Sequence, residues 1–172
     1  MAIRAIIEAP DPRLKVISKP VKAVDNDLRQ LIDDMVETMY AASGIGLAAI
    51  QVGVAKRVLV LDISSDEEEP DPRYFVNPEI VWTSDELVIY NEGCLSLPEY
   101  YAEVERPAAC RVEYLDYDGN RQTLEASGLL STCIQHECDH LEGILFVDHL
   151  SSLKRDMILR KLAKAKKLKA AE

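Results

Sequence analysis

The chain has 172 residues, 48% of them hydrophobic, which is enough for one folded domain with a substantial core. Residues 1–150 carry 12 Lys and Arg against 28 Asp and Glu, a net charge of −16, whereas residues 151–172 carry 8 against 2, a net charge of +6. This acidic body excludes a nucleic-acid-binding surface everywhere except the last segment. Because the sequence shows neither a signal peptide nor an apolar run of about 18 residues, we expect a soluble, cytoplasmic protein without a membrane segment.

Apolar periodicity and turn residues predict the elements in chain order. They are a helix at 25–42, strands at 57–63 and 87–90, a hairpin at 110–126, a helix at 127–141 and a last helix from about 151. An acidic loop at 64–73 separates the two strands, the hairpin turns at Asp118 and Gly119, and Gly143 ends the second helix. Because helices and strands do not alternate along the chain, this order favours the α+β class.

An HExxH sequence, His136 to His140, lies inside the helix predicted at 127–141. Residues four apart lie on one helix face, so both imidazoles can hold one metal ion. Glu137 flanks this pair, where it can act as the general base for water activated by a metal. A catalytic divalent site of this kind needs a third protein ligand and one open position.

The residues alone leave the third ligand open. Phe146 stands where a metzincin has its third histidine, which excludes that class, and His149 lies beyond the break at Gly143, so we interpret it as a surface or capping residue. Cys138 faces away from the ligand face, Cys133 is expected to line a pocket wall, and a core position is expected for the remaining strand cysteine, Cys110. The remaining candidates are Cys94, Glu142, Asp148, Asp156 and Glu172.

Three segments together resemble the signature motifs of the peptide deformylase family: GIGLAAIQ at 44–51, EGCLS at 92–96 and QHECDH at 135–140. The resemblance runs from DPRL at 11–14 to HLEGILFVDHLSSLK at 140–154, and the basic C-terminal helix is similar to that of Gram-negative-type bacterial members. It implies antiparallel sheets packed around the HExxH helix, between an N-terminal and a C-terminal helix. It also implies a single catalytic domain at 1–150 and a basic helix at 151–172 appended to it.

The function that the resemblance implies is hydrolysis of the N-formyl group from the initiator methionine of nascent polypeptides, with release of formate. By their positions in the motifs, Cys94, His136 and His140 would bind one divalent metal ion, physiologically Fe(II), which Zn(II), Ni(II) or Co(II) could replace. The other catalytic residues would be Glu137 as acid and base, and Gln51 with the backbone N–H of Leu95 as the oxyanion hole.

The resemblance also implies that the peptide is added as a strand beside Gly46, while a hydrophobic pocket takes the methionine side chain. The substrate-binding residues implied in this way are Ile45, Gly46, Glu92, Gly93, Leu129, Thr132 and Cys133. Glu92 is further expected to pair with Arg106 and to support the loop that carries Cys94.

The basic C-terminal helix is expected to dock on the ribosome near the tunnel exit, as it does in the bacterial enzymes that the chain resembles. Leu150, Leu153 and Met157 are predicted to pack on the body while the lysines project outward, and a monomer is the expected state. Two other functions are considered, an HExxH peptidase that cuts internal peptide bonds and an inactive, ribosome-associated family member. The product distinguishes them, because only a deformylase releases formate from a formylated peptide.

Overall fold

A computed structural model describes residues 2–171; Met1 and Glu172, the last residue of the predicted basic segment and a candidate metal ligand, lie outside the described residues. The helices are α1 (Asn26–Ala41), α2 (Gly128–Leu141) and α3 (Ser152–Ala170), with short 3-10 turns η1 (Pro12–Lys15), η2 (Ala49–Val52) and η3 (Phe146–His149). The strands are β1 (Gly46–Ala48), β2 (Val58–Leu61), β3 (Arg73–Thr83), β4 (Leu87–Cys94), β5 (Leu97–Pro107), β6 (Ala109–Leu115) and β7 (Arg121–Ser127). The predicted α+β class is confirmed.

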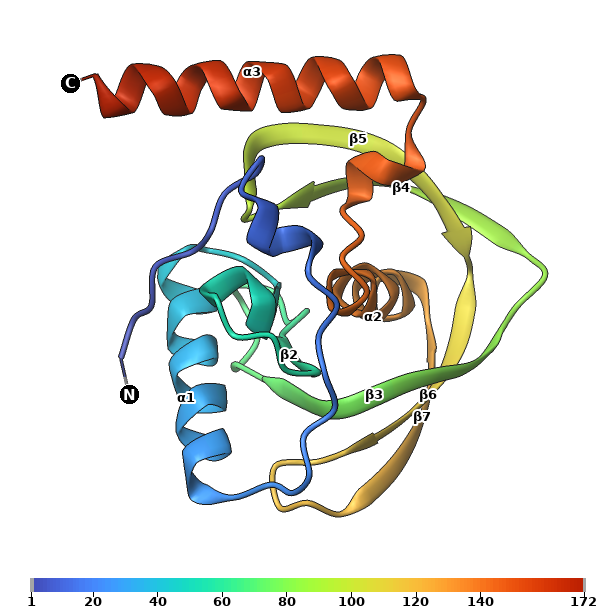
Figure 1. Cartoon of the computed structure of the whole chain (residues 1–172). Coiled ribbons are helices and arrows are strands. Elements are labelled where there is room, and N and C mark those ends of the chain that lie inside the picture. Colours follow the sequence, from blue (N-terminus) through green and yellow to red (C-terminus); the bar gives the residue numbers. More distant parts are fainter. Residues whose placement is uncertain (1, 172) are drawn as a thin grey trace.

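Two antiparallel sheets surround the central helix α2, which Figure 1 shows nearly end-on in the middle of the molecule. One sheet has the strand order β1-β2-β3-β6-β7, and the other consists of β4 and β5. Ile134 and Leu141 of α2 are fully buried and belong to one core cluster with Leu59, Leu61 and Phe75 from strands β2 and β3. Burial of this apolar surface fixes α2 against the larger sheet.

Helix α1 begins as its sequence predicts, because the Asp25 side chain accepts a hydrogen bond from the Leu28 backbone N–H at 2.8 Å. Its apolar positions are buried in a second core cluster that also contains Val58 and Val60 of β2. These positions are Leu28, Leu31, Ile32, Met35 and Met39. The predicted amphipathic helix is therefore confirmed, and it packs beside β1 and β2 (Figure 1).

Gly143 ends the HExxH helix as predicted and also lets another segment pass close to it. Its φ of 73° is the left-handed conformation that glycine adopts without strain. A Cβ at this position would overlap the backbone carbonyl oxygen of Lys15. The N-terminal segment therefore crosses the end of α2 at a point where only glycine fits.

Strands β3 and β5 were missing from the sequence prediction, and β4 is longer than predicted. Strand β3 contains Pro78 and a left-handed Asn77, and its register with β6 shifts twice, so its apolar residues do not alternate regularly. Strand β5 contains Pro98 and a left-handed Glu99. These residues interrupt the regular alternation from which strands are predicted.

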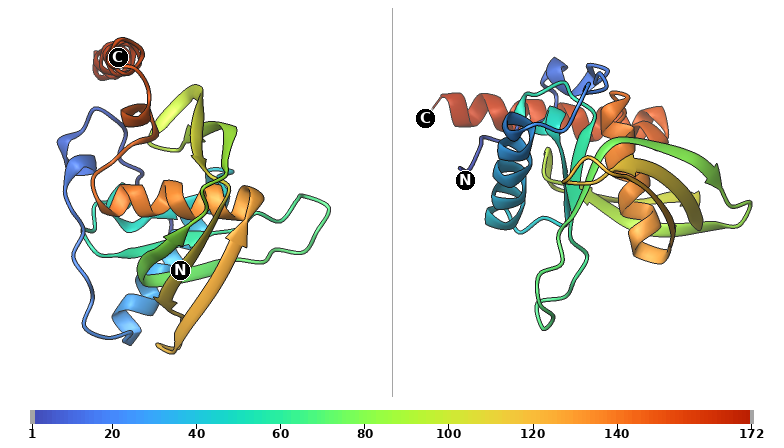
Figure 2. Two further views of the ribbon diagram at one scale, coloured as in Figure 1. Left: turned by 90° about the vertical axis from the view of Figure 1, so that its right-hand side faces the viewer. Right: turned by 90° about the horizontal axis from the view of Figure 1, so that it is seen from below.

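Helix α3 crosses the outside of the molecule, as two views agree (Figures 1 and 2). The prediction that Leu153 and Met157 pack on the body is wrong: they are 82% and 45% exposed, while Ile158 and Leu162 are buried. The reason is that Leu150 precedes the helix, whose N-cap is Ser151, so Leu150 does not set the register of its buried face.

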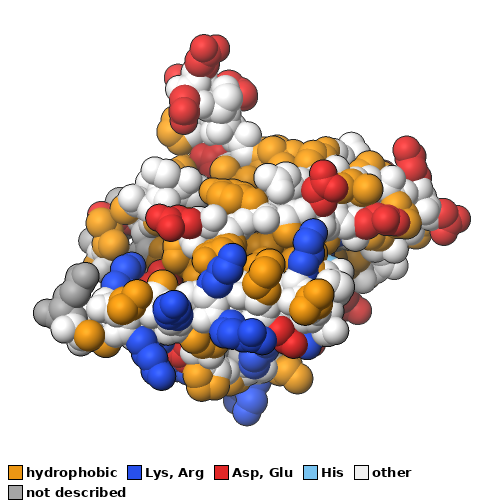
Figure 3. Space-filling view, turned by 90° about the horizontal axis from the view of Figure 1, so that it is seen from above, with side chains coloured by type: hydrophobic (Ala, Val, Ile, Leu, Met, Phe, Trp, Pro, Cys, Tyr) orange, Lys and Arg blue, Asp and Glu red, His pale blue; other side chains and the backbone are white. Residues whose placement is uncertain are grey.

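The lysines of α3 are all exposed, and Figure 3 shows Lys and Arg side chains gathering over this face. They are Lys154, Lys161, Lys164, Lys166, Lys167 and Lys169. Within residues 2–171, none of the helices is both long enough and apolar enough to span a bilayer.

Candidate metal centre and active site

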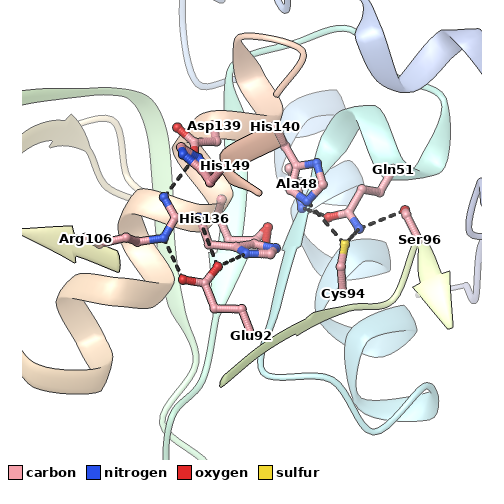
Figure 4. Close-up of polar contacts among 11 residues, drawn as sticks. Ala48, Gln51, Glu92, Cys94, Ser96, Arg106, His136, Asp139, His140 and His149 are labelled. Carbon is pink, nitrogen blue, oxygen red and sulfur yellow. Dashed lines mark hydrogen bonds and ion pairs between the residues drawn. The ribbon is translucent and has the colours of Figure 1, made fainter. Parts of the chain in front are cut away.

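Cys94, His136 and His140 converge on one point between β4 and α2 (Figure 4). One ligand atom from each of these side chains lies within 4.8 Å of the others, and Cys94 Sγ is 3.4 Å from His140 Nε2. The two histidines are one helical turn apart, as the HExxH spacing predicts. Among the described residues, Cys94 is thus the third member of this group, and the carboxylates of Glu142, Asp148 and Asp156 are not part of it.

Cys94 reaches this point because strand β4 ends in an irregular pairing. The register between β4 and β5 shifts at Gly93 and Cys94, and such irregularities redirect a side chain. Gln51 supports the turn that follows: its Nε2 donates to Ser96 Oγ at 2.9 Å and lies 3.5 Å from Cys94 Sγ. Its Oε1 accepts from the Ala48 backbone N–H at 2.9 Å, which fixes the orientation of the amide.

The ring of His136 is oriented by the Arg106 network, which consists of Glu92, Arg106 and Asp139 (Figure 4). Glu92 Oε1 lies 2.9 Å from His136 Nδ1, so the other ring nitrogen is left to face a metal. Arg106 donates to both carboxylate oxygens of Glu92, at 2.6 and 2.9 Å, and to Asp139 at 2.8 Å. The predicted Glu92–Arg106 pair therefore forms, and it is buried.

This network keeps the Glu92 carboxylate ionised. Burial alone would raise the pKa of Glu92, but the hydrogen bonds from His136 and Arg106 outweigh the burial and hold that pKa below its usual value. A charged Glu92 accepts a strong hydrogen bond from His136 Nδ1, which makes the opposite nitrogen a better metal ligand.

Glu137 lies beside the ligands at the wall of a cavity of about 520 Å³. Strand β1 approaches it so closely that a Cβ on Gly46 would lie 3.0 Å from Glu137 Oε1. Burial raises the pKa of Glu137 to about 7, although the charges of His136 and Arg106 oppose this shift. A carboxyl group with such a pKa can accept and return a proton near neutral pH.

The donor set fits a divalent transition metal. One thiolate and two imidazoles would suit iron, cobalt, nickel or zinc, and Cys94 and His136 also line the cavity. Within residues 2–171, the buried atoms Glu137 Oε2 and His140 Nδ1 have no hydrogen-bond partner. A polar atom that is buried without a partner is costly, so the unpartnered Glu137 Oε2 beside the ligands is what a site built around another group would show, whereas His140 faces Cys94 with its other nitrogen, Nε2.

Most of the site residues predicted from the sequence line this cavity. They are Ile45, Gly46, Glu92, Gly93, Cys94, Leu95, Leu129, Thr132, Cys133, His136 and Glu137. Gln51 and His140 are not among the lining residues, but Gln51 Nε2 lies 3.5 Å and His140 Nε2 3.4 Å from Sγ of Cys94, which lines the cavity. Both oxygens of Glu92 are engaged by Arg106 and His136. Tyr90 and Asn91 also line the cavity, and no motif in the sequence singled them out.

Comparison with known proteins points to one family. A family model described as polypeptide deformylase matches residues 3–156. The peptide deformylase of Phenylobacterium zucineum is 60% identical over 95% of this chain and 97% of its own length. That of Rhizobium meliloti is 57% identical over 100% of this chain and 99% of its own length.

Solved structures agree with the sequence comparison. The crystal structure of peptide deformylase from Ehrlichia chaffeensis has a TM-score of 0.93 at 42% identity and covers 98% of this chain and 99% of its own. A structure of the Ehrlichia chaffeensis peptide deformylase in complex with actinonin has a TM-score of 0.92 at 45% identity, with 96% and 98% covered.

Replacing Arg106 with leucine should destabilise the fold strongly, because Glu92 and Asp139 would keep their charges without a buried partner. We expect a loss of about 3–5 kcal/mol in the free energy of unfolding, measured by urea denaturation. Arg111→Leu is the matched control: Arg111 contacts Glu125 at the same 2.6 Å, but in solvent, so its loss should cost at most about 1 kcal/mol. Equal losses in the two variants would contradict the structural role of the Arg106 network.

Proposed function

Because this chain belongs to the peptide deformylase family, we propose that Cys94, His136, His140 and Glu137 form its catalytic centre. The chain is a hydrolase that removes the N-formyl group from nascent polypeptides and releases formate. The observation that carries the assignment of the site is the convergence of three potential ligand atoms within 4.8 Å of one another, beside the cavity that Glu137 lines.

The three ligands would hold one divalent metal ion, which we propose to be Fe(II) physiologically, with Zn(II), Ni(II) and Co(II) as substitutes. When bound, such an ion supplies Lewis-acid activation of water and of the formyl carbonyl group. The soft Cys94 thiolate and the two imidazoles suit each of these ions. Glu92 contributes by holding the ring of His136 with Nε2 toward the site.

Glu137 would carry the proton in both halves of the reaction. It would accept a proton from the water that attacks the formyl carbon, and then give that proton to the amine that leaves. Its position at the cavity wall and its pKa of about 7 support this double role. Its buried Oε2 has no hydrogen-bond partner among the described residues, so no other group of the chain holds this oxygen.

Gln51 and the backbone N–H of Leu95 would stabilise the oxyanion that forms on the formyl oxygen. The amide of Gln51 is held by Ala48 and Ser96, so its Nε2 group lies beside Cys94 without freedom to turn. Leu95 follows the ligand directly, in the turn between β4 and β5. The Gln51 amide is therefore preorganised, as an oxyanion hole requires.

The peptide would bind as an added strand along β1, which is an edge strand of the larger sheet and contains Gly46. Glu92 and Gly93 would border the bound peptide on the opposite side. We propose that the methionine side chain enters the part of the cavity formed by Ile45, Leu129, Thr132, Cys133 and His136. Thr132 Oγ1 is buried and has no partner among the described residues, so it is the polar element of this pocket.

Formate release from formyl-Met-Ala-Ser tests this assignment directly. Protein purified without oxygen and supplied with iron should release formate rapidly. Glu137→Ala should lower the rate by at least about 100-fold, because it removes the acid and base. Cys94→Ala should abolish release by removing a metal ligand, whereas Cys110→Ala, at a buried thiol outside the site, should retain it.

Two results would contradict the assignment. Formate release that persists at the wild-type rate in Glu137→Ala would exclude Glu137 as the acid and base. A new amino terminus inside the peptide, without formate, would favour an HExxH peptidase.

We also propose that residues 151–172 form a ribosome-binding helix, appended to a catalytic domain at 1–150, near the tunnel exit. The charge of +6 on this segment, against −16 on the rest, allows only this end to approach ribosomal RNA. Its lysines are exposed, and its contact with the body rests on Ile158 and Leu162. The chain would then act in the cytoplasm, as a monomer, on peptides that emerge from the ribosome.

Deleting residues 155–172 should weaken binding to ribosomes while leaving formate release from short peptides intact. Because the contact is electrostatic, the affinity of the full chain should fall steeply as salt is raised, and the truncated chain should lack this dependence. Sedimentation with purified ribosomes at several salt concentrations measures both effects. Equal ribosome binding by the truncated chain would contradict the proposal.

A further inference from the structure

His149 is exposed, yet its ring contacts a residue of the HExxH helix that its position after the helix break did not predict. It is the last residue of η3, and its side chain is 36% exposed. Its Nε2 lies 2.8 Å from Asp139 Oδ2, a distance at which the ring N–H donates to the carboxylate (Figure 4). His149 is therefore a surface residue, as predicted, but it also contacts the HExxH helix itself, which the sequence did not predict.

The contact connects His149 to a metal ligand through an unbroken line of polar groups. The oxygen of Asp139 that accepts from His149 also accepts from Arg106 Nη1 at 2.8 Å. Arg106 holds Glu92 at 2.6 and 2.9 Å, and Glu92 Oε1 lies 2.9 Å from Nδ1 of the ligand His136. Each step is a hydrogen bond of 3 Å or less between groups of fixed geometry.

Among Glu92, Arg106 and Asp139, the side chain of Asp139 is the most exposed and therefore the least restrained by packing. Its side chain is 23% exposed, whereas those of Arg106 and Glu92 are 5% and 6% exposed. Without His149, the carboxylate of Asp139 could turn toward solvent and leave the Nη1 end of the guanidinium without a fixed acceptor. Arg106 would then hold Glu92 less rigidly, because a guanidinium fork is fixed by acceptors at both ends.

The same turn contacts His136 a second time. The ring of Phe146, the first residue of η3, stacks on that of His136, with 6.2 Å between centroids and 25° between planes. The turn η3 therefore limits the movement of His136 from one side through an aromatic ring and from the other through a line of hydrogen bonds. Both contacts act on the orientation of one metal-binding ring.

We propose that His149 is a positioning residue for the metal ligand His136, acting through Asp139 and the rest of the Arg106 network. This inference rests on the proposed metal site at Cys94, His136 and His140. It assigns to His149 no contact with substrate or metal. Its effect is to keep the imidazole of His136 in the orientation that retains the ion.

The test is the rate at which the cobalt-loaded enzyme loses Co(II) to an excess of EDTA. In His149→Leu we expect the release to be about tenfold faster than in wild type, the lower end of what is seen when groups that orient metal ligands are removed. His149→Gln should restore slow release, because its amide can still donate to Asp139. Asp139→Asn, which removes the shared charged acceptor, should behave like His149→Leu.

Lys15→Ala is the matched control, because it removes a contact of the turn η3 without removing the contact between His149 and Asp139. Lys15 pairs with Asp148, which also belongs to η3, but this pair has no contact with Asp139. The control should release Co(II) at the wild-type rate. The visible absorption of bound Co(II) should change in His149→Leu and return in His149→Gln, which a purely structural effect on stability would not produce.

Wild-type release rates in both His149→Leu and Asp139→Asn would overturn the proposal, as would fast release in His149→Gln or in Lys15→Ala. These outcomes leave the proposed function intact if the wild-type enzyme retains Co(II) and releases formate. Failure of the wild-type chain to bind Co(II) at Cys94, His136 and His140 would instead overturn the proposed metal site and this inference with it.

Discussion

The buried guanidinium of Arg106 joins the two parts of the molecule that must meet for a metal centre to form. It lies on β5, in the small sheet that carries Cys94, and it contacts Glu92 of that sheet and Asp139 of helix α2. Both carboxylates are held below their usual pKa, so their charges depend on Arg106 for compensation. The position of the thiol relative to the two histidines follows from this contact, because Cys94 lies on the small sheet and both histidines lie on α2.

The chemistry at the site depends on the opposite pKa shifts of its two buried carboxylates. Glu92 and Glu137 are both buried beside His136, yet Glu92 has a lowered pKa and Glu137 a pKa of about 7. Hydrogen bonds from Arg106 and His136 account for the first shift and burial for the second. One carboxylate thereby orients a ligand with a permanent charge, while the other is free to exchange a proton with the substrate.

Sequence patterns predicted the parts of the site that depend on local geometry. The HExxH spacing placed His136 and His140 on one face of a helix because helical periodicity is fixed by the backbone. Cys94 lies more than 40 residues away, and only the resemblance of its motif to the family pointed to it, since spacing contains no information about which strand meets which helix. The contact of His149 was missed for the same reason, because a 3-10 turn after Gly143 brings it back to α2.

The central claim is that Cys94 completes a three-ligand metal centre, and metal binding tests it most directly. Apoprotein titrated with Co(II) should take up one ion per chain and show a thiolate-to-metal absorption band. Cys110→Ala, which removes a fully buried thiol from the main core, should keep both properties, whereas Cys94→Ala should lose the band and bind Co(II) far more weakly. A thiolate band that survives in Cys94→Ala would contradict the account.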